Sequence, residues 1–259
     1  MIALAALSLM AVVGSPAVQA SDPEEGFVSP FKPSENVMVD VQRTLDAAGA
    51  DGKLALVVMG ATWCHDSRAL AQRFADPEIK ASLDARYEVV FVDVDYLDTA
   101  RAVNQRFGMP SIYATPTVMI VDPSTERLTN AKTMHQWRNA DRISYADTKA
   151  YFEAEAEKAH APISVSPKLA DLYAEIDAFE QQQAARLIEG YDQLGPLMRA
   201  YDAGDKKNGM LPLWNEVRGF RFALTDDLLR LRADAEAKVA SGDDTPLTYP
   251  TYDALSWEE

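Results

Sequence analysis

The chain contains a single cysteine, Cys64, in the segment 63–67, which reads Trp-Cys-His-Asp-Ser. A thiol can act as a nucleophile, form mixed disulfides or be oxidised, so this segment is the first candidate for chemistry. It follows the apolar run 54–59, which is typical of a buried strand, and it leads into the segment 67–74, where apolar residues recur at helical spacing. We therefore expect an exposed thiol in the first turn of a helix, where free backbone N–H groups and the helix dipole favour the thiolate.

The sequence around Cys64 resembles the active site of the thioredoxin superfamily. In that family a buried strand precedes the motif Trp-Cys-x-x-Cys, and a cis-proline preceded by Ile, Val or Thr packs beside the reactive sulfur. The dipeptide Thr115-Pro116 matches this proline. The resemblance covers residues from about 35 to 160 and is closest in kind to exported bacterial domains of the thiol:disulfide interchange type. It implies an α/β fold in which helices flank a central mixed sheet.

The elements expected from the sequence follow the thioredoxin order. They are a helix over 36–48, a strand over 54–59, the active-site helix over 67–74, a strand over 87–94, a helix over 99–107 and a strand over 117–121. A last helix over 146–158 begins after Ser144, because Asp147 three residues later completes a helix start signal.

Two departures from the family motif affect the expected chemistry. Ser67 stands where the family has its second cysteine, and Val58 stands where thioredoxins carry a buried acid. A dithiol reductase needs a resolving thiol to release its substrate, and Ser67 cannot supply one. Its hydroxyl can still donate a hydrogen bond to the Cys64 thiolate, because helix positions three apart share a face. The sequence therefore predicts monothiol chemistry or none.

The neighbours of the cysteine allow different roles. Trp63 either shields the sulfur and contacts a peptide or only packs, and His65 is expected to be solvated rather than a catalytic acid. Asp66 fits a first-turn helix position, which the dipole favours. The backbone before Pro116 would align a client strand. The candidate catalytic residues are Cys64 and Ser67, and the candidate substrate-contacting residues are Trp63, His65, Thr115 and Pro116.

Plainer interpretations stay open for two of these positions. Cys64 could be a small buried hydrophobe, which is where free cysteines most often lie, or an inherited site that has lost its chemistry. Pro116 could be an ordinary trans proline before a strand.

The chain is expected to have four parts. Residues 1–20 are apolar and end in small residues, which predicts a signal peptide; an uncleaved anchor is the alternative, but the apolar stretch is short for a membrane span. Residues 21–160 would form the thioredoxin-like domain, 161–240 a helical extension and 241–259 an acidic tail. Export to the periplasm would place a lone thiol in an oxidising compartment.

The extension is predicted to be a helical hairpin. Apolar residues recur every three or four positions in 169–188 and in 217–231, and the turn-rich segment 203–209 separates them. These stripes pack on each other and on the first domain, or else they form a groove for a protein partner. The tail would wrap over the protein or stay partly unstructured.

Charge and residue types limit the other functions. The net charge is −15, from 40 Asp and Glu against 25 Lys and Arg, so nucleic acid and anionic lipid are not expected ligands. The histidines His65, His135 and His160 are far apart, so no metal site is expected, and no motif indicates a cofactor. We expect an exported monothiol protein that exchanges disulfides with client or small thiols, or, as the alternative, a non-catalytic thioredoxin-fold module that binds a partner or serves envelope assembly.

Overall fold

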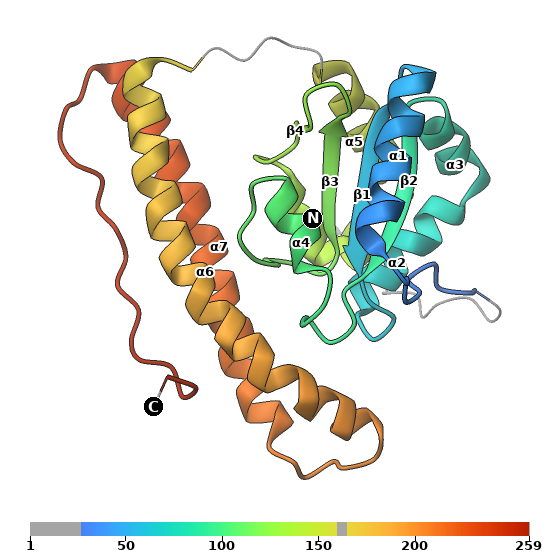
Figure 1. The fold of residues 1–259 in the computed structure, drawn as a ribbon. Coiled ribbons are helices and arrows are strands. Elements are labelled where there is room, and N and C mark those ends of the chain that lie inside the picture. The colour runs from blue at the N-terminus through green and yellow to red at the C-terminus, as the bar shows by residue number, and fades with distance from the viewer. Residues whose placement is uncertain (1–26, 160–164, 259) are drawn as a thin grey trace, which may run out of the picture.

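The computed structural model describes residues 27–159 and 165–258 of the chain. Figure 1 shows two parts: residues 27–159, which we call the sheet domain, and a pair of long antiparallel helices, which we call the hairpin. The predicted signal peptide and the predicted domain boundary near residue 160 lie outside the described residues. The domain limits of the sequence analysis therefore remain predictions.

The sheet domain is built on a mixed four-stranded sheet. Its strands, in the order in which they pair, are β2 (Tyr87–Asp93), β1 (Leu54–Gly60), β3 (Thr117–Asp122) and β4 (Arg127–Leu128). Strand β1 runs parallel to β2 and antiparallel to β3, and all seven of its residues are buried. A central strand covered on both faces reads as a continuous apolar run, which is why its position could be predicted.

Helices cover both faces of this sheet. They are α1 (Val37–Asp51), α2 (His65–Ala75), α3 (Pro77–Asp84), α4 (Arg101–Arg106), the 3-10 segment η1 (Met134–Arg142) and α5 (Tyr145–Lys158). Side chains alternate along β1, so Val57 belongs to the core cluster that includes residues of α1, α4 and the hairpin, whereas Val58 belongs to the cluster that includes residues of α2, α3, η1 and α5. The mixed α/β fold with flanking helices is confirmed.

Some elements differ from the sequence prediction. Helix α4 begins only at Arg101 because Ala100 adopts a left-handed backbone with φ of 60°, which is not helical. Helix α3 was not predicted, although Asp76 caps it by accepting from the N–H groups of Glu78 and Ile79 and Pro77 occupies its first position. The short strand β4 and the 3-10 segment η1 were also missed. Strand β4 has only two residues, which is too short to show a period, and η1 is interrupted at Asn139, where φ of −126° and ψ of 41° are not helical.

The predicted hairpin is present and packs on the sheet domain. It consists of α6 (Pro167–Asp202) and α7 (Met210–Ser241), and its buried side chains form one cluster with those of α1 and the sheet. The buried hydroxyl of Tyr191 donates to the carbonyl of Ile112 in the sheet domain. Because the apolar stripes face each other and the sheet domain, they do not form the open partner groove considered above.

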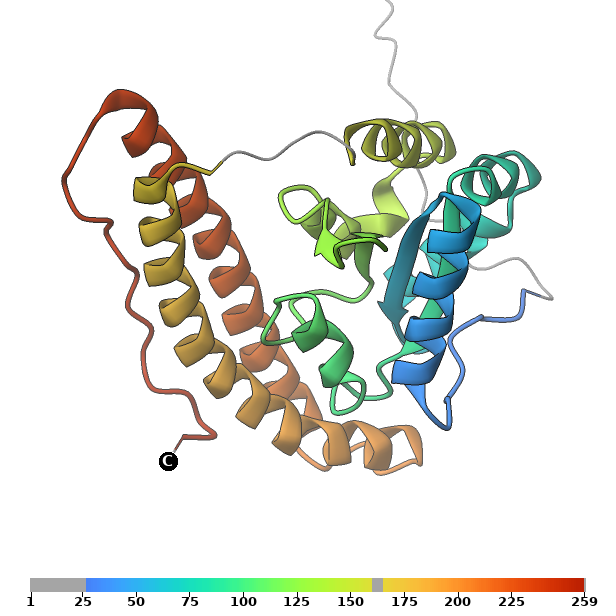
Figure 2. The same cartoon turned by 45° about the horizontal axis from the view of Figure 1, so that its top comes forward.

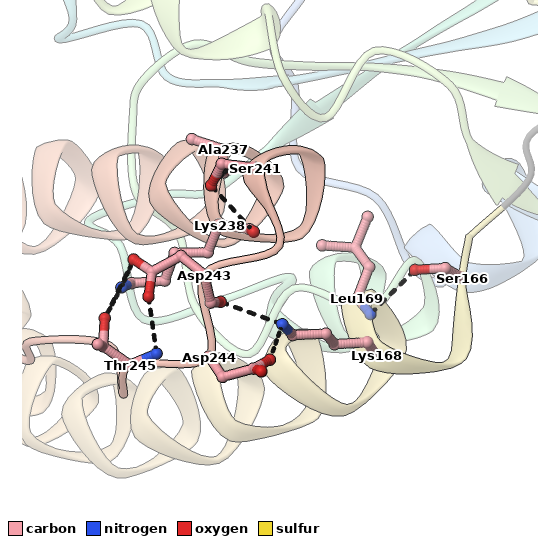
Figure 3. Close-up of polar contacts among 9 residues, drawn as sticks. All are labelled: Ser166, Lys168, Leu169, Ala237, Lys238, Ser241, Asp243, Asp244 and Thr245. Carbon is pink, nitrogen blue, oxygen red and sulfur yellow. Dashed lines mark hydrogen bonds and ion pairs between the residues drawn. The ribbon is translucent and has the colours of Figure 1, made fainter.

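The chain after α7 runs back along the hairpin, on the side away from the sheet (Figures 1 and 2). Figure 3 shows how it starts: Lys238 pairs with the Asp243 carboxylate at 2.8 Å, and Lys168 of α6 donates to the Asp243 carbonyl at 3.0 Å. At its other end Trp257 is buried against α6 and α7, and its indole N–H donates to the carbonyl of Arg186 at 2.8 Å. The tail was expected either to wrap over the protein or to stay partly unstructured. The described residues 242–258 wrap over the hairpin.

Over the described residues, none of the helices combines the length and the apolar character that crossing a membrane requires.

Candidate functional site

Cys64 lies where strand β1 gives way to helix α2. It is the N-cap residue of α2, one position before the helical turn in which it was expected, with φ of −83° and ψ of 119°. Its backbone N–H donates to the carbonyl of Ala61 at 3.2 Å, and its carbonyl accepts from the N–H of Arg68 at 3.1 Å. The side chain makes no capping bond, so the thiol is free to face another partner.

That partner is the backbone just before Pro116. The Sγ of Cys64 donates a hydrogen bond to the carbonyl oxygen of Thr115 at 3.2 Å. The Thr115–Pro116 bond is cis, as the resemblance implied. Thr117 Oγ1 donates to the carbonyl of Ala114 at 2.6 Å and so closes the turn around these two residues. The segment with Cys64 and the segment with Pro116 are far apart in sequence, but the fold brings them into contact at the Cys64 sulfur.

The thiol is less accessible than the sequence analysis expected. Cys64 is buried, with 9% of its surface exposed, because the Thr115 carbonyl lies against the sulfur. The expectation of an exposed thiol was therefore wrong for this conformation. Thr115 and Pro116 are themselves buried, so they are not open to a client chain as the molecule stands.

Ser67 does not face the sulfur. It is fully buried, and its Oγ accepts from the backbone N–H of Ala61 at 3.4 Å, whereas no bond to Cys64 is present among the described residues. A Cβ on Gly60 would stand 2.7 Å from this oxygen, so glycine leaves the space that Ser67 occupies. The predicted hydrogen bond from Ser67 to the thiolate is wrong here, because the hydroxyl points back to the end of β1 and ties the helix start to the strand.

Trp63 is partly buried and serves a contact that the sequence did not indicate. Its indole N–H donates to the carbonyl of Asp95 at 2.6 Å. The ring also stands edge-on to Trp214 of helix α7, with 5.7 Å between the ring centroids. Of the two interpretations of Trp63, packing describes this conformation, since the hairpin occupies the surface that a peptide would contact.

His65 belongs to a cluster with two carboxylates. Its side chain is 61% exposed, and Nε2 lies 3.1 Å from Asp141 Oδ2 while Nδ1 lies 3.6 Å from Asp66 Oδ2. Asp66 also accepts the backbone N–H of Asp141 at 3.0 Å. Burial and a hydrogen bond shared with the Asp141 side chain raise the pKa of Asp66 to about 6. Asp141 lies in η1, far along the chain, so no local signal in the sequence placed it beside His65.

The ligand atoms of these three side chains lie within 4.8 Å of one another. The spacing of the histidines led us to expect no metal site. This spacing could not show that the fold places the carboxylates of Asp66 and Asp141 beside His65. His65 lies within ion-pair distance of both carboxylates, one residue beyond the thiol.

Comparison with a family model agrees with the fold of the sheet domain. Residues 36–123 match a family model described as thioredoxin-like. Among solved structures, the chain is similar to the disulphide isomerase from Xylella fastidiosa Temecula1, with 25% sequence identity, a TM-score of 0.46, and coverage of 50% of this chain and 98% of that one. No curated protein matches the sequence.

Proposed function

We propose that the chain, whose residues 36–123 match a thioredoxin-like family model, forms mixed disulfides through Cys64 as a monothiol protein. The observation that carries the proposal is the bond from the Cys64 sulfur to the carbonyl of Thr115, directly before the cis-proline. It places the one thiol of the chain at a helix start and beside a backbone group that can pair with a client.

The exchange step follows from the thiol count. The Cys64 thiolate attacks one sulfur of a client disulfide, a new S–S bond forms, and the other client sulfur leaves as a thiolate with the electron pair of the broken bond. The chain has one cysteine, so no internal thiol can attack the mixed disulfide. An external thiol, from the client or from glutathione, must release it. Isomerisation and glutathione-linked exchange meet this requirement.

Thr115 has a role in this proposal that uses its carbonyl. Once the sulfur is bonded to a client, it no longer carries a proton to donate, and the Thr115 oxygen is free to accept a backbone N–H of the client strand. In the resting protein, the Cys64 thiol therefore occupies the Thr115 carbonyl, which accepts a client N–H once the mixed disulfide has formed. Ser67 supports the site by holding the start of α2 to β1.

The alternative is a non-catalytic thioredoxin-fold module. Two observations favour it: Cys64 is only 9% exposed, and Trp63 is covered by Trp214. In that case the cysteine is a buried structural residue, and binding to a partner does not depend on the thiol.

We also propose that the protein is exported, most simply to a periplasm. The support is the apolar sequence of residues 1–20 with small residues before Ser21. A lone thiol in an oxidising compartment would then meet disulfides of other proteins and of small molecules.

The test compares folded and denatured protein from Ser21 to Glu259 in glutathione disulfide, with intact mass recording the adduct on Cys64. We expect the folded protein to gain one glutathione on Cys64, and reduced glutathione to remove it. The Cys64→Ser variant is the control and gains none. If the folded protein reacts a hundredfold more slowly than the denatured chain, Cys64 is structural and the monothiol function is excluded.

A second readout tests function on a protein substrate. In glutathione buffer, the protein should accelerate the recovery of activity from scrambled ribonuclease, and Cys64→Ser should abolish the acceleration. Acceleration that survives this substitution would assign the effect to binding rather than to the thiol.

A further inference from the structure

A cavity of about 650 Å³ lies between the sheet domain and the hairpin. On one side its wall is formed by the end of α4, the loop before β3, strand β4 and the start of η1, and on the other by α6 and α7. Small-molecule sites in proteins typically have volumes of about 300–1,000 Å³ and often lie between domains. The cavity is distinct from the thiol site, because Cys64 does not line it, although Ala114 and Thr117 on its wall flank Thr115 and Pro116.

Most of the wall is apolar and comes from both parts of the molecule. The largest apolar side chains that line it are Phe107, Met109, Leu128, Met134, Leu228 and Leu229. A ligand that fills this space must therefore present an apolar body, because burying such a body removes apolar surface from water on both sides.

Two polar atoms on the same wall are buried without a partner. Neither the hydroxyl of Tyr113 nor the Nδ1 of His135 makes a hydrogen bond of normal length and angle to a described residue, although the Glu180 carboxylate lies near the first and the backbone of Lys132 near the His135 ring. Burial, and then the nearby Glu180 carboxylate, raise the pKa of Tyr113, so its hydroxyl keeps the proton and can donate it. Burial, and then the neighbouring Arg138, lower the pKa of His135, so the imidazole is neutral at neutral pH. Buried polar groups normally pair, so these two atoms indicate where a polar head would bind.

The charged side chains on the wall are already paired within the described chain. Arg232 donates to Asp177 and to Glu180, each at 2.8 Å, and Lys132 lies 2.6 Å from Glu236. Acids outnumber bases in this set, and no cation among them is left without a carboxylate. An anionic ligand would have to break one of these pairs, so the lining disfavours it.

We propose that this cavity binds a small uncharged molecule with an apolar body and one hydroxyl, carbonyl or amide head, which pairs with Tyr113 or His135. The proposal goes beyond thiol exchange and does not depend on Cys64. Ligand binding here would join the sheet domain to the hairpin, because both contribute to the wall.

The first test uses the uncharged fluorescent probe N-phenyl-1-naphthylamine with the protein from Ser21 to Glu259. We expect saturable binding with a stoichiometry of one, and at least a tenfold loss of affinity in Leu229→Trp, which fills the cavity from α7. The matched control is Leu211→Trp, also in α7 but 52% exposed and away from the cavity, which should bind as the unchanged protein does. Ala233→Trp is a second filling variant on the same wall, in case Leu229→Trp does not fold.

The second test addresses the head group. We expect 4-butylphenol to displace the probe better than butylbenzene, and Tyr113→Phe to weaken the phenol by about threefold to tenfold while leaving butylbenzene unchanged. Stronger displacement by 4-butylbenzoate than by 4-butylphenol would overturn the uncharged class. Absence of saturable probe binding, or equal binding by the filling variants, would overturn the site itself. Cys64→Ser should bind the probe normally, so failure of the thiol chemistry and failure of this site give different results.

Discussion

The indole of Trp63 stands edge-on to the indole of Trp214, with 5.7 Å between centroids and 89° between the ring planes. Trp214 belongs to α7, so the hairpin contacts the residue directly before the thiol. The hairpin also reaches the partner of the Trp63 N–H, because Arg199 of α6 lies 2.6 Å from the carboxylate of Asp95. Trp63 thus contacts the hairpin directly through Trp214 and indirectly through Asp95 and Arg199, and we predict that the docking of the hairpin limits access to Cys64.

Replacing Trp214 should therefore expose the thiol. An edge-to-face aromatic pair contributes about 0.5–1.5 kcal/mol beyond its buried area, so Trp214→Ala should increase the population in which Trp63 is free by about twofold to thirteenfold. We expect alkylation of Cys64 by iodoacetamide to accelerate by that factor, measured on folded protein at neutral pH. Leu211→Ala, an exposed position in the same helix, is the control. An unchanged rate in Trp214→Ala would mean that the hairpin does not limit access to the sulfur.

Restoring the second thiol tests whether the site keeps the geometry of its family. Ser67 is buried one helical turn after the N-cap Cys64, so Ser67→Cys should allow a disulfide between the two positions under oxidising conditions. The variant should then gain reductase activity toward a model disulfide such as insulin, followed by turbidity in dithiothreitol. The double variant Cys64→Ser with Ser67→Cys keeps one thiol and should show none. No gain in the first variant would argue that the pocket is closed to disulfide substrates.

The parts of this site that were predictable are those encoded in contiguous residues. The apolar run of β1, the Trp-Cys start of α2 and the Thr-Pro before β3 each carry a local signal, and the family resemblance joined them before any distance was known. The cis bond and the meeting of Cys64 with Thr115 follow that pattern.

The contacts that decide accessibility had no such signal. Asp141 comes to Asp66 across 75 residues, and Trp214 comes to Trp63 from a different part of the fold. Helical periodicity in 217–231 indicated that the hairpin would pack, but not which aromatic ring would stand on the active-site loop. The direction of the Ser67 hydroxyl depends on the space beside Gly60, which spacing alone does not show.

The Asp66 carboxyl makes stability depend on pH in a defined direction. Burial, and then its bond to Asp141, raise the pKa of Asp66 from 3.8 to about 6, so the folded protein holds this proton more tightly than the unfolded chain. Its contribution favours folding below about pH 4 and is lost as the pH rises through about 6. Asp66→Asn keeps an oxygen for the Asp141 N–H and cannot ionise. We expect the variant to match the unchanged protein near pH 4 and to exceed it in thermal stability above pH 7, by at most about 3 kcal/mol.

Thermal unfolding between pH 4 and 8, followed by circular dichroism, checks this difference. The Asp141→Asn variant is the comparison. Burial raises the pKa of Asp141, but hydrogen bonds with Asp66 and His65 outweigh it and lower this pKa overall. The ionised Asp141 carboxylate therefore stabilises the fold, and Asp141→Asn should be less stable than the unchanged protein above pH 7. Parallel pH profiles for Asp66→Asn and the unchanged protein would show that folding does not raise the pKa of Asp66.

The packing of the C-terminal tail on the hairpin depends on Gly190 in α6, which leaves space for Trp257. A Cβ at Gly190 would stand 2.8 Å from the buried indole of Trp257 and 3.2 Å from Val217, whereas a Cβ at Gly219 in α7 would meet nothing within 4 Å. The same substitution should thus have opposite effects at the two sites. Gly219→Ala should stabilise the protein by about 0.5–1 kcal/mol, because alanine restricts the unfolded chain and favours the helix. Gly190→Ala should destabilise it by about 1–3 kcal/mol, since the rigid indole ring of Trp257 must move.

Urea unfolding measures the free energy of unfolding of both variants, and faster proteolysis after residue 242 in Gly190→Ala would locate the change in the tail. Equal effects at the two glycines would mean that Trp257 does not pack against Gly190.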